Sequence, residues 1–576
     1  MLYVDPSRRF FLKHFDRNED YTPAVDHQAP DLDRLPFDMR RQLLRESEVR
    51  DVDAWESRVE WDRGNWLETV SDRLLRHKLG VAFDVDETAA RATKLANLSV
   101  KLKDYAAIEN MAVQLDLELP EGNSESTEAS IALRCHEPKT WRRIIDKKNT
   151  RMAENELRKI GFIQKGDQLY CSDLAVNWYQ GKMRTQEAYL KSRTVSDGTT
   201  QLELWDVVQK SISNKSNRRT ELMTRMRGLE DYSKEVGHVG TFITLTAPSA
   251  FHSRLFNGGS NPLFNEGDVR SAQGWLCRMW ARARAKLQKL KVEIYGMRVA
   301  EPHHDGTPHW HMVLFCAPDH RESLCDVLRS KWLSEHGGES GAHEHRATFK
   351  AIESAKGSAT GYLSKYIAKN IDGFDVGKDY EQDGAEASDT VTRVTAWASI
   401  HGIRQFQQIG KRSAGVTLYR TCRRRRRATD TPRIERLRLA ADVHDYCGFI
   451  KVSERWQFSL WKESGVSVDR ATGEIVVEKN AFGEVRPPKI VGVETLTERM
   501  RTRLKTWRIE RKFGPNRAAG KGVGLNAGSG FEASGPVRAF SESALGPVSI
   551  TVAAGPGLSD PHGWTNPNET SMYGPN

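Results

Sequence analysis

The middle of the chain, residues 237–427, combines two patterns of apolar residues. Strand-like runs, β-branched or alternating, cover residues 241–246, 292–301, 309–315 and 347–351. Runs with apolar residues at helical spacing cover residues 269–290 and 358–370. The order strand, helix, strand, strand, helix predicts an α+β domain with a central antiparallel sheet.

The pattern differs on either side of this domain. Residues 1–230 are rich in charge and poor in glycine, with apolar residues three to four apart in the run from Trp66 to Leu75, which predicts a mainly helical region. This region is expected to be either a scaffold or a recognition domain. Residues 430–512 predict a small C-terminal extension of helical character. Residues 514–576 are rich in Gly, Pro, Ser, Ala and Asn and are expected to form a disordered tail.

Two histidines mark the start of the strand predicted at 309–315. His309 and His311 are two residues apart, so their side chains point to the same side of that strand. A turn at Asp305-Gly306 folds the chain back and can bring Glu301 beside them. Two imidazoles and a carboxylate are suitable ligands for a divalent cation, and this mixed set favours Mg²⁺ or Mn²⁺ without excluding zinc.

A His-x-His pair alone is weak evidence for a metal site. Residues 343–345 have the same spacing, and there we expect an exposed polar turn. His303 and His304 lie in the turn itself and are interpreted as facing solvent or DNA. The first pair is distinguished by the apolar strand that follows it and by the acid across the turn.

The helix predicted at 358–370 carries a second group of reactive side chains. Tyr362, Lys365, Tyr366 and Lys369 are spaced three or four apart and therefore share one face. An amphipathic helix with half-buried tyrosines would show the same pattern. Beside a metal, however, a tyrosine could attack a phosphodiester. Because a free phenol has a pKa of about 10, either lysine or the metal would have to favour the phenolate.

Charge is consistent with a nucleic-acid partner. The chain carries a net charge of +10. Between Arg278 and Arg298 the sequence has seven basic residues and one acidic residue. Such runs are often solvated surfaces, but next to a phosphodiester site they favour phosphate contact. The candidate DNA-binding residues are Arg278, Arg282, Arg284, Arg423, Arg424 and Arg425. With neither a membrane span nor a signal peptide in the sequence, a cytoplasmic protein without membrane contact is expected.

These motifs resemble the replication gene A proteins of temperate tailed phages, which belong to the HUH superfamily of rolling-circle endonucleases. Residues 241–246 resemble the family's first, structural strand. Residues 308–311 resemble its His-hydrophobic-His motif, with Glu301 in the position of the additional acid. Residues 362–366 resemble the two-tyrosine motif, and residues 397–410 resemble the region that follows it.

The resemblance implies an HUH endonuclease domain that nicks one strand at a phage origin within the bacterial host cell. A tyrosine would become linked to the 5′ phosphate of single-stranded or supercoiled origin DNA. The 3′ hydroxyl would prime a host DNA polymerase while a host helicase unwinds the duplex. The tyrosines follow the histidines here, whereas conjugative relaxases have the reverse order, which favours a replication initiator.

Two other functions are compatible with the same residues. A metal-dependent nuclease could use water as its nucleophile, with Tyr362 and Tyr366 serving only the structure. A non-catalytic origin-binding protein would depend on the basic face of the helix predicted at 269–290 and on the five consecutive arginines at 423–427. It would tolerate loss of His309 and His311.

Overall fold

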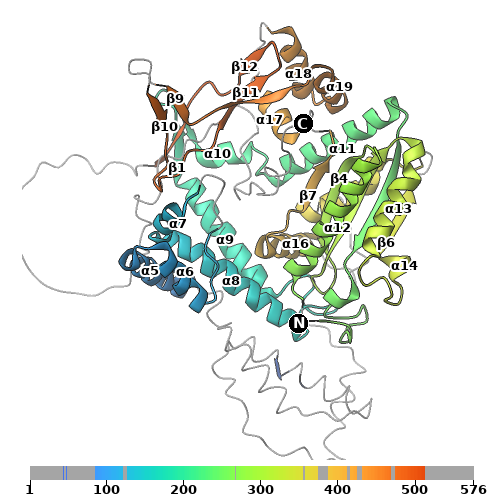
Figure 1. Cartoon of the computed structure of the whole chain (residues 1–576), viewed down its shortest axis with the longest axis horizontal. Coiled ribbons are helices and arrows are strands. Elements are labelled where there is room, and N and C mark those ends of the chain that lie inside the picture. Colours follow the sequence, from blue (N-terminus) through green and yellow to red (C-terminus); the bar gives the residue numbers. More distant parts are fainter. Residues whose placement is uncertain are drawn as a thin grey trace, which may run out of the picture. The chain divides into compact units, whose positions relative to one another are not determined.

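The computed structural model describes residues 43–44, 47, 85–120, 126–265, 267–353, 357–373, 387–411, 415–423, 431–468 and 474–512 (Figure 1). Contacts divide the chain into two units, Met1–Glu87 and Thr88–Asn576. The helical run predicted from Trp66 to Leu75 and the tail at 514–576 lie outside the described residues, as do Arg424 and Arg425. The elements described below belong to the second unit, except that the first helix, α5 (Val85–Leu102), begins at the end of the first unit.

A five-stranded antiparallel sheet forms the centre of the second unit. Its strands are β3 (Val239–Thr246), β4 (Tyr295–Pro302), β5 (Pro308–Cys316), β6 (Ala347–Ala351) and β7 (Phe406–Ile409). They are ordered β6-β3-β5-β4-β7, and each neighbouring pair is antiparallel. The predicted α+β class with an antiparallel sheet is confirmed. Four of the strands were predicted and β7 was not.

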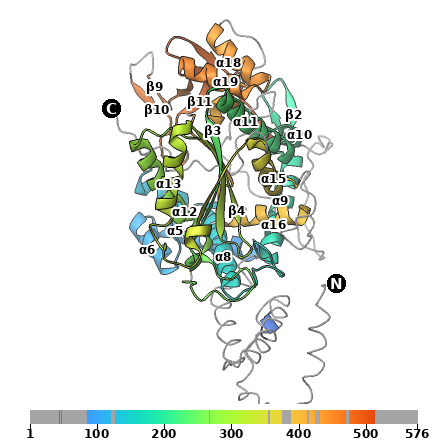
Figure 2. The ribbon, with the colours of Figure 1, turned by 90° about the vertical axis from the view of Figure 1, so that its right-hand side faces the viewer.

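Helices cover both faces of this sheet. Trp310, Met312 and Leu314 on β5 pack with α12 (Val269–Lys289) and α13 (Arg321–Trp332). Val313 and Phe315, on the opposite face of β5, pack with α11 (Lys215–Glu235) and α15 (Ala359–Ile371). Figure 2 shows α12 and α13 on one side of the sheet and α15 on the other. The alternation along β5 therefore assigns each of its side chains to one of two separate layers.

The described part of the N-terminal region is mainly helical, as predicted. Its helices are α5 (Val85–Leu102), α6 (Tyr105–Gln114), α7 (Glu128–Cys135), α8 (Pro138–Lys159), α9 (Asp173–Lys191) and α10 (Leu204–Gln209). Two short strands, β1 (Arg193–Ser196) and β2 (Gln201–Glu203), interrupt it. No helix among the described residues is long and apolar enough to cross a bilayer.

The helical character predicted for residues 430–512 is wrong beyond Trp456. After α16 (Ala387–His401) and α17 (Val416–Cys422), the chain forms α18 (Pro432–Asp442) and α19 (Tyr446–Trp456). It continues as β8 (Ser459–Glu463), β9 (Val466–Val468), β10 (Ile475–Val477), β11 (Lys489–Glu494), β12 (Arg499–Arg501) and β13 (Arg508–Arg511). β13 pairs with β1 from the N-terminal region. A partner distant in the sequence thus satisfies the backbone groups of β13, and a local pattern does not reveal that pairing.

A buried ion pair holds the turn between β4 and β5. The Asp305 carboxylate accepts hydrogen bonds from Thr307 N at 3.0 Å and from Ser253 N at 2.9 Å. It lies 3.4 Å from Arg158, and the two side chains are 0% and 1% exposed. Burial alone would raise the pKa of Asp305, but His252 and Arg158 hold this pKa well below its usual range. Asp305 is therefore a charged anchor inside the protein.

Arg158, near the end of α8, extends this anchor to the loop between β3 and α12. Its guanidinium donates hydrogen bonds to the carbonyl oxygens of Phe251 and Gly267, the latter at 3.0 Å. It also donates to the Asp305 carbonyl at 2.8 Å. One side chain thus ties both ends of the loop to the β4–β5 turn.

We expect Arg158→Met to lower the free energy of unfolding by about 3–5 kcal/mol, because the Asp305 carboxylate would stay buried without its cation. Urea unfolding followed by tryptophan fluorescence measures this change. The double variant Arg158→Met/Asp305→Leu should lose less stability than the single variant. Arg278→Met, at an exposed position on α12, is the matched control. Equal urea midpoints for Arg158→Met and the wild type would contradict this interpretation.

Candidate active site

Glu301, His309 and His311 converge on one face of the central sheet. Strand pairing places Glu301 of β4 directly opposite His309 of β5. The Nε2 atoms of the two histidines are 2.9 Å apart, and Glu301 Oε2 lies 3.6 Å from His311 Nε2. Among the described residues, these three form the group whose potential ligand atoms all lie within 4.8 Å of one another.

The chemistry of this group fits a divalent metal ion. Glu301 and His311 are buried, and His309 keeps part of its surface exposed. Burial, with a smaller contribution from the charge of Lys369, lowers the pKa of His311 to about 3. Burial, followed by the neighbouring histidines and Lys369, also holds the pKa of His309 well below its ordinary value. Both imidazoles are therefore neutral, which is the form that binds metals.

Polar neighbours orient two of these ligands. Thr244 Oγ1 on β3 lies 3.1 Å from His311 Nδ1, which leaves Nε2 facing the other two residues. Asn370 donates a hydrogen bond from Nδ2 to Glu301 Oε1. Its Oδ1 accepts a bond of 3.2 Å from Gln405 Nε2. Because Asn370 belongs to α15, it connects the Glu301 carboxylate to the helix that carries the tyrosines.

Local interactions hold α15 in position. Ser358 caps its N-terminus by accepting a hydrogen bond of 2.9 Å from Gly361 N. Thr360 N and Oγ1 both donate to Glu230 of α11, at 2.9 and 2.6 Å. Leu363 and Ile367 are fully buried in the core, as their spacing predicts. The adjacent face of the helix, which carries Tyr366 and Asn370, is thereby turned toward the histidines and Glu301.

Both tyrosines are partly exposed beside the candidate metal site. The Tyr366 ring stacks on the His311 ring with centroids 4.0 Å apart. The Phe242 ring of β3 lies 5.7 Å from the ring of Tyr362 and 5.8 Å from that of Tyr366. The structure thus brings the two-tyrosine motif and the His-x-His motif together.

The lysines near the tyrosines differ in their surroundings. Lys369 is buried, and its charge contributes to the lowered pKa values of His309 and His311. Lys365 is exposed. Lys350 on β6, which sequence reasoning missed, has its Nζ 5.3 Å from the centre of the Tyr362 ring. Lys369 therefore acts on the histidines through its charge, and Lys350 is the lysine with a described contact to Tyr362.

The histidines of the turn and of the second His-x-His pair lie in different environments. His303 is partly exposed, and its ring lies 4.0 Å from the His309 ring, so it borders the candidate metal site. Its Nε2 is buried and has no hydrogen-bond partner among the described residues. His304 is partly exposed. His343 and His345 are exposed in α14 (Ala342–His345), a single helical turn.

The arginines proposed to bind DNA do not surround this site. Arg278, Arg282 and Arg284 are exposed on α12, which covers the opposite face of the sheet. Arg282 also pairs with Glu335 at 2.6 Å. The expectation that these residues lie beside Glu301, His309 and His311 is wrong. The apolar stripe of α12 packs against Trp310 and its neighbours, and not against the face of the sheet that carries those three residues, here called the histidine layer.

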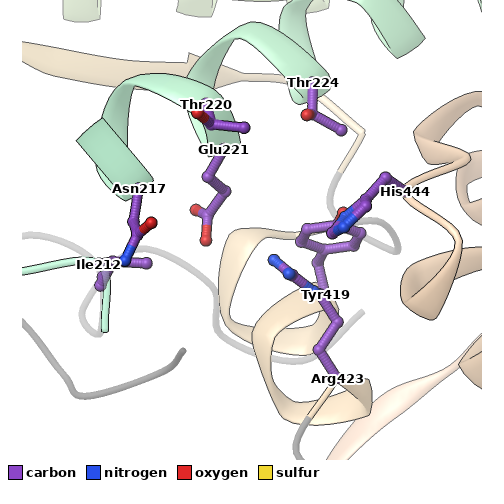
Figure 3. A pocket seen from close by; sticks show the side chains of 8 residues that line it. All are labelled: Ile212, Asn217, Thr220, Glu221, Thr224, Tyr419, Arg423 and His444. Carbon is purple, nitrogen blue, oxygen red and sulfur yellow. The ribbon is translucent and has the colours of Figure 1, made fainter. Parts of the chain in front are cut away.

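Arg423 lies in a third location. It follows α17 and lines a hollow that is also lined by Ile212, Asn217, Thr220, Glu221, Thr224, Tyr419 and His444 (Figure 3). The carboxylate of Glu221 accepts hydrogen bonds from Arg420 at 2.8 and 3.0 Å. None of the residues that line this hollow belongs to the group of Glu301, His309 and His311.

Asn370, Gln405, Thr244 and Lys350 are site neighbours that sequence reasoning missed. Asn370 had a usable signal, because it lies four residues after Tyr366 on the same helix. The positions of the other three depend on which strands become neighbours.

Comparisons with known proteins agree with the layout of these motifs. The model of the bacteriophage replication gene A protein (GPA) family matches residues 79–374. A probable replication protein P12 of Pseudoalteromonas phage PM2 is 34% identical, over 65% of this chain and 58% of the relative. The replication gene A protein of Escherichia phage 186 is 36% identical, over 64% of this chain and 54% of the relative.

A further relative is named for an activity. A probable replication endonuclease from a prophage-like region of Salmonella paratyphi A is 33% identical, over 60% of this chain and 44% of the relative. The matched part thus spans about half the length of these relatives. No solved structure matches the chain.

We expect Asn370→Ala to weaken Mn²⁺ binding by about 10- to 100-fold, because Glu301 would lose the amide that orients it. Isothermal titration of the metal-free protein with Mn²⁺ measures the dissociation constant. Ser364→Ala, which removes a hydroxyl elsewhere on α15, should leave that constant unchanged. His309→Ala provides the reference for loss of a ligand. An unchanged dissociation constant in Asn370→Ala would exclude this orienting role.

Proposed function

The chain belongs to the bacteriophage replication gene A protein family, and on this premise we propose that it is a replication endonuclease that nicks DNA by tyrosine attack. The names of its relatives, a replication gene A protein and a probable replication endonuclease among them, support this class of activity. The proposal treats residues 237–427 as an HUH endonuclease domain. Because the relatives are about twice as long as the matched segment, the activity proposed here is that of the matched segment.

One observation carries the proposal, the stacking of Tyr366 on His311. A phenol and an imidazole of the candidate metal site are in direct contact there, at 4.0 Å between ring centroids. A tyrosine that served only to fill the core would not need to lie against an imidazole whose Nε2 faces a carboxylate. Tyr362, one turn away, lies beside the ammonium of Lys350.

A Mg²⁺ or Mn²⁺ ion held by Glu301, His309 and His311 would neutralise charge on the scissile phosphate and make phosphorus more electrophilic. The phenolic oxygen of one tyrosine attacks phosphorus and gives up its proton as the new O–P bond forms. The bond from phosphorus to the 3′ oxygen breaks, and that oxygen takes up a proton. Lys369 is buried on the same helix, and its positive charge would stabilise the negative charge that develops in the transition state.

The product is a 5′-phosphotyrosine and a free 3′ hydroxyl. The ester conserves the energy of the phosphodiester, so a 3′ hydroxyl can later attack it and restore the DNA strand. With two tyrosines on one helix, one can hold a DNA end while the other cleaves again. This capacity suits rolling-circle replication of an origin, in which a host helicase and a host DNA polymerase would take part.

Incubation with labelled single-stranded DNA and Mn²⁺, followed by a denaturing gel, tests the proposal. The wild type should form a metal-dependent covalent protein–DNA adduct. Tyr362→Phe/Tyr366→Phe should form none, whereas each single variant should retain some through its remaining phenol. His309→Ala should lose the adduct because a metal ligand is missing.

The two alternative functions predict different products on the denaturing gel. Cleavage without an adduct would mean hydrolysis by water and would refute the tyrosine mechanism. If the protein binds DNA without cleavage or adduct, and His309→Ala binds DNA equally well, it is a non-catalytic origin-binding protein. Ser364→Ala, which removes a hydroxyl elsewhere on the same helix, is the matched control.

The exposed arginines of α12 are proposed to contact duplex DNA on the opposite face of the sheet. The triple variant Arg278→Gln/Arg282→Gln/Arg284→Gln should weaken duplex binding. It should also lower the salt dependence by about one unit of log–log slope for each phosphate that is no longer neutralised by an arginine. Adduct formation on a short single strand should be unchanged. Fluorescence anisotropy at several salt concentrations gives the slope, and an unaltered slope would rule out this role for the three arginines.

A further inference from the structure

We propose that Phe256, at the tip of the loop between β3 and α12, is a stacking platform for a base of the single-stranded DNA next to the scissile phosphate. The inference rests on the proposed nicking function and concerns how its substrate is held. Neither the His-x-His motif nor the two-tyrosine motif includes this loop.

The tip of the loop is a small hairpin with its own hydrogen bonds. Arg254 and Ser260 form an antiparallel bridge, and their side chains are joined by a bond of 2.9 Å. Leu255 N donates to the Gly259 carbonyl at 2.8 Å, and Gly258 N donates to the Leu255 carbonyl at 2.9 Å. Phe256 is therefore presented on an ordered turn rather than on a loose loop.

Phe256 is unusually exposed for a large apolar residue, at 72% of its surface. Two leucines of the same loop, Leu255 and Leu263, are 41% and 54% exposed. A single exposed apolar side chain needs no explanation, but three on one loop indicate a surface that something covers.

The loop is close to the candidate active site through a short series of contacts. The Leu255 carbonyl lies 3.1 Å from His304 Nε2, and the Phe256 and His304 rings meet edge to face at 5.9 Å. The adjacent residue, His303, lies with its ring 4.0 Å from the ring of His309. A nucleotide bound at the histidines would thus have its neighbour within reach of Phe256.

Charge indicates a nucleotide rather than an apolar protein segment as the occupant. The ammonium of Lys165 lies 4.6 Å from the centre of the Phe256 ring. An aromatic ring beside a cation matches the two parts of a nucleotide, because the ring stacks on the base and the cation attracts the phosphate.

The base of the loop is fixed in a way that suits binding. Arg158 and Asp305 are buried and tie Phe251, Ser253 and Gly267 to the β4–β5 turn. A platform that is already ordered loses less conformational entropy when it binds its ligand. The same ion pair that anchors the turn therefore fixes the distance between Phe256 and the histidines.

Binding is tested in the full chain carrying Tyr362→Phe/Tyr366→Phe, so that no covalent bond forms. The probe is a fluorescein-labelled oligodeoxythymidylate of about 20 nucleotides, since stacking tolerates any base. In this background Phe256→Ala should raise the dissociation constant about tenfold, and Phe256→Trp should restore it. Leu496→Ala, a 96% exposed position in the β11–β12 turn, should change nothing.

A second readout reports stacking itself. A probe with 2-aminopurine at successive positions should show quenching at one position, and Phe256→Ala should remove that quenching. Equal dissociation constants for Phe256→Ala and its parent would overturn the platform. The platform would also be overturned if Phe256→Ala lost self-association in sedimentation but bound DNA normally, since a second copy of the chain would then be the occupant.

The binding assay and the adduct assay can refute the stacking platform and the nicking function independently of each other. If wild-type protein forms the covalent adduct but Phe256→Ala binds normally, the platform alone is wrong. If Phe256→Ala loses binding and no adduct forms in the wild type, the platform stands and tyrosine nicking does not.

Discussion

The register between β4 and β5 is the constraint on which the rest of the site depends. It sets Glu301 opposite His309 and leaves His311 on the same face. A slip by one residue would turn both histidines toward α12 and α13 and would expose Trp310 to the other layer. The turn that joins these strands is held by the buried Asp305–Arg158 pair. A structural ion pair outside the metal group thereby controls where the metal group can form.

The metal group and the tyrosine helix are mechanically coupled. Asn370 donates hydrogen bonds both to Glu301 and to the Tyr366 carbonyl, the latter at 2.7 Å. A shift of α15 along its axis would therefore disturb the carboxylate as well as the phenols. The buried packing of Leu363 and Ile367 resists such a shift. This arrangement suits a reaction in which a nucleophile and a metal must meet the same phosphate.

The two faces of the sheet separate two kinds of surface. The histidine layer carries neutral imidazoles and partly exposed phenols beside Lys369, whereas the far side of α12 carries exposed arginines. Chemistry on a single strand needs precise local contacts, and binding of a duplex needs only positive charge spread over a surface. The exposed loop at Phe256 borders the first of these surfaces through its contact with His304.

The sequence by itself determined the strands that carry the histidines, the helix that carries the tyrosines and the sharing of a face within each, because period and turn chemistry are local properties. It also indicated the buried side of α15. Only the tertiary structure decided that β7 joins the sheet, that β13 pairs with β1, and that Gln405 reaches Asn370. It alone brought His303 against His309 and placed α12 on the opposite face. These outcomes depend on which distant segments pair, and pairing is selected by the packing of the whole unit rather than by any local pattern.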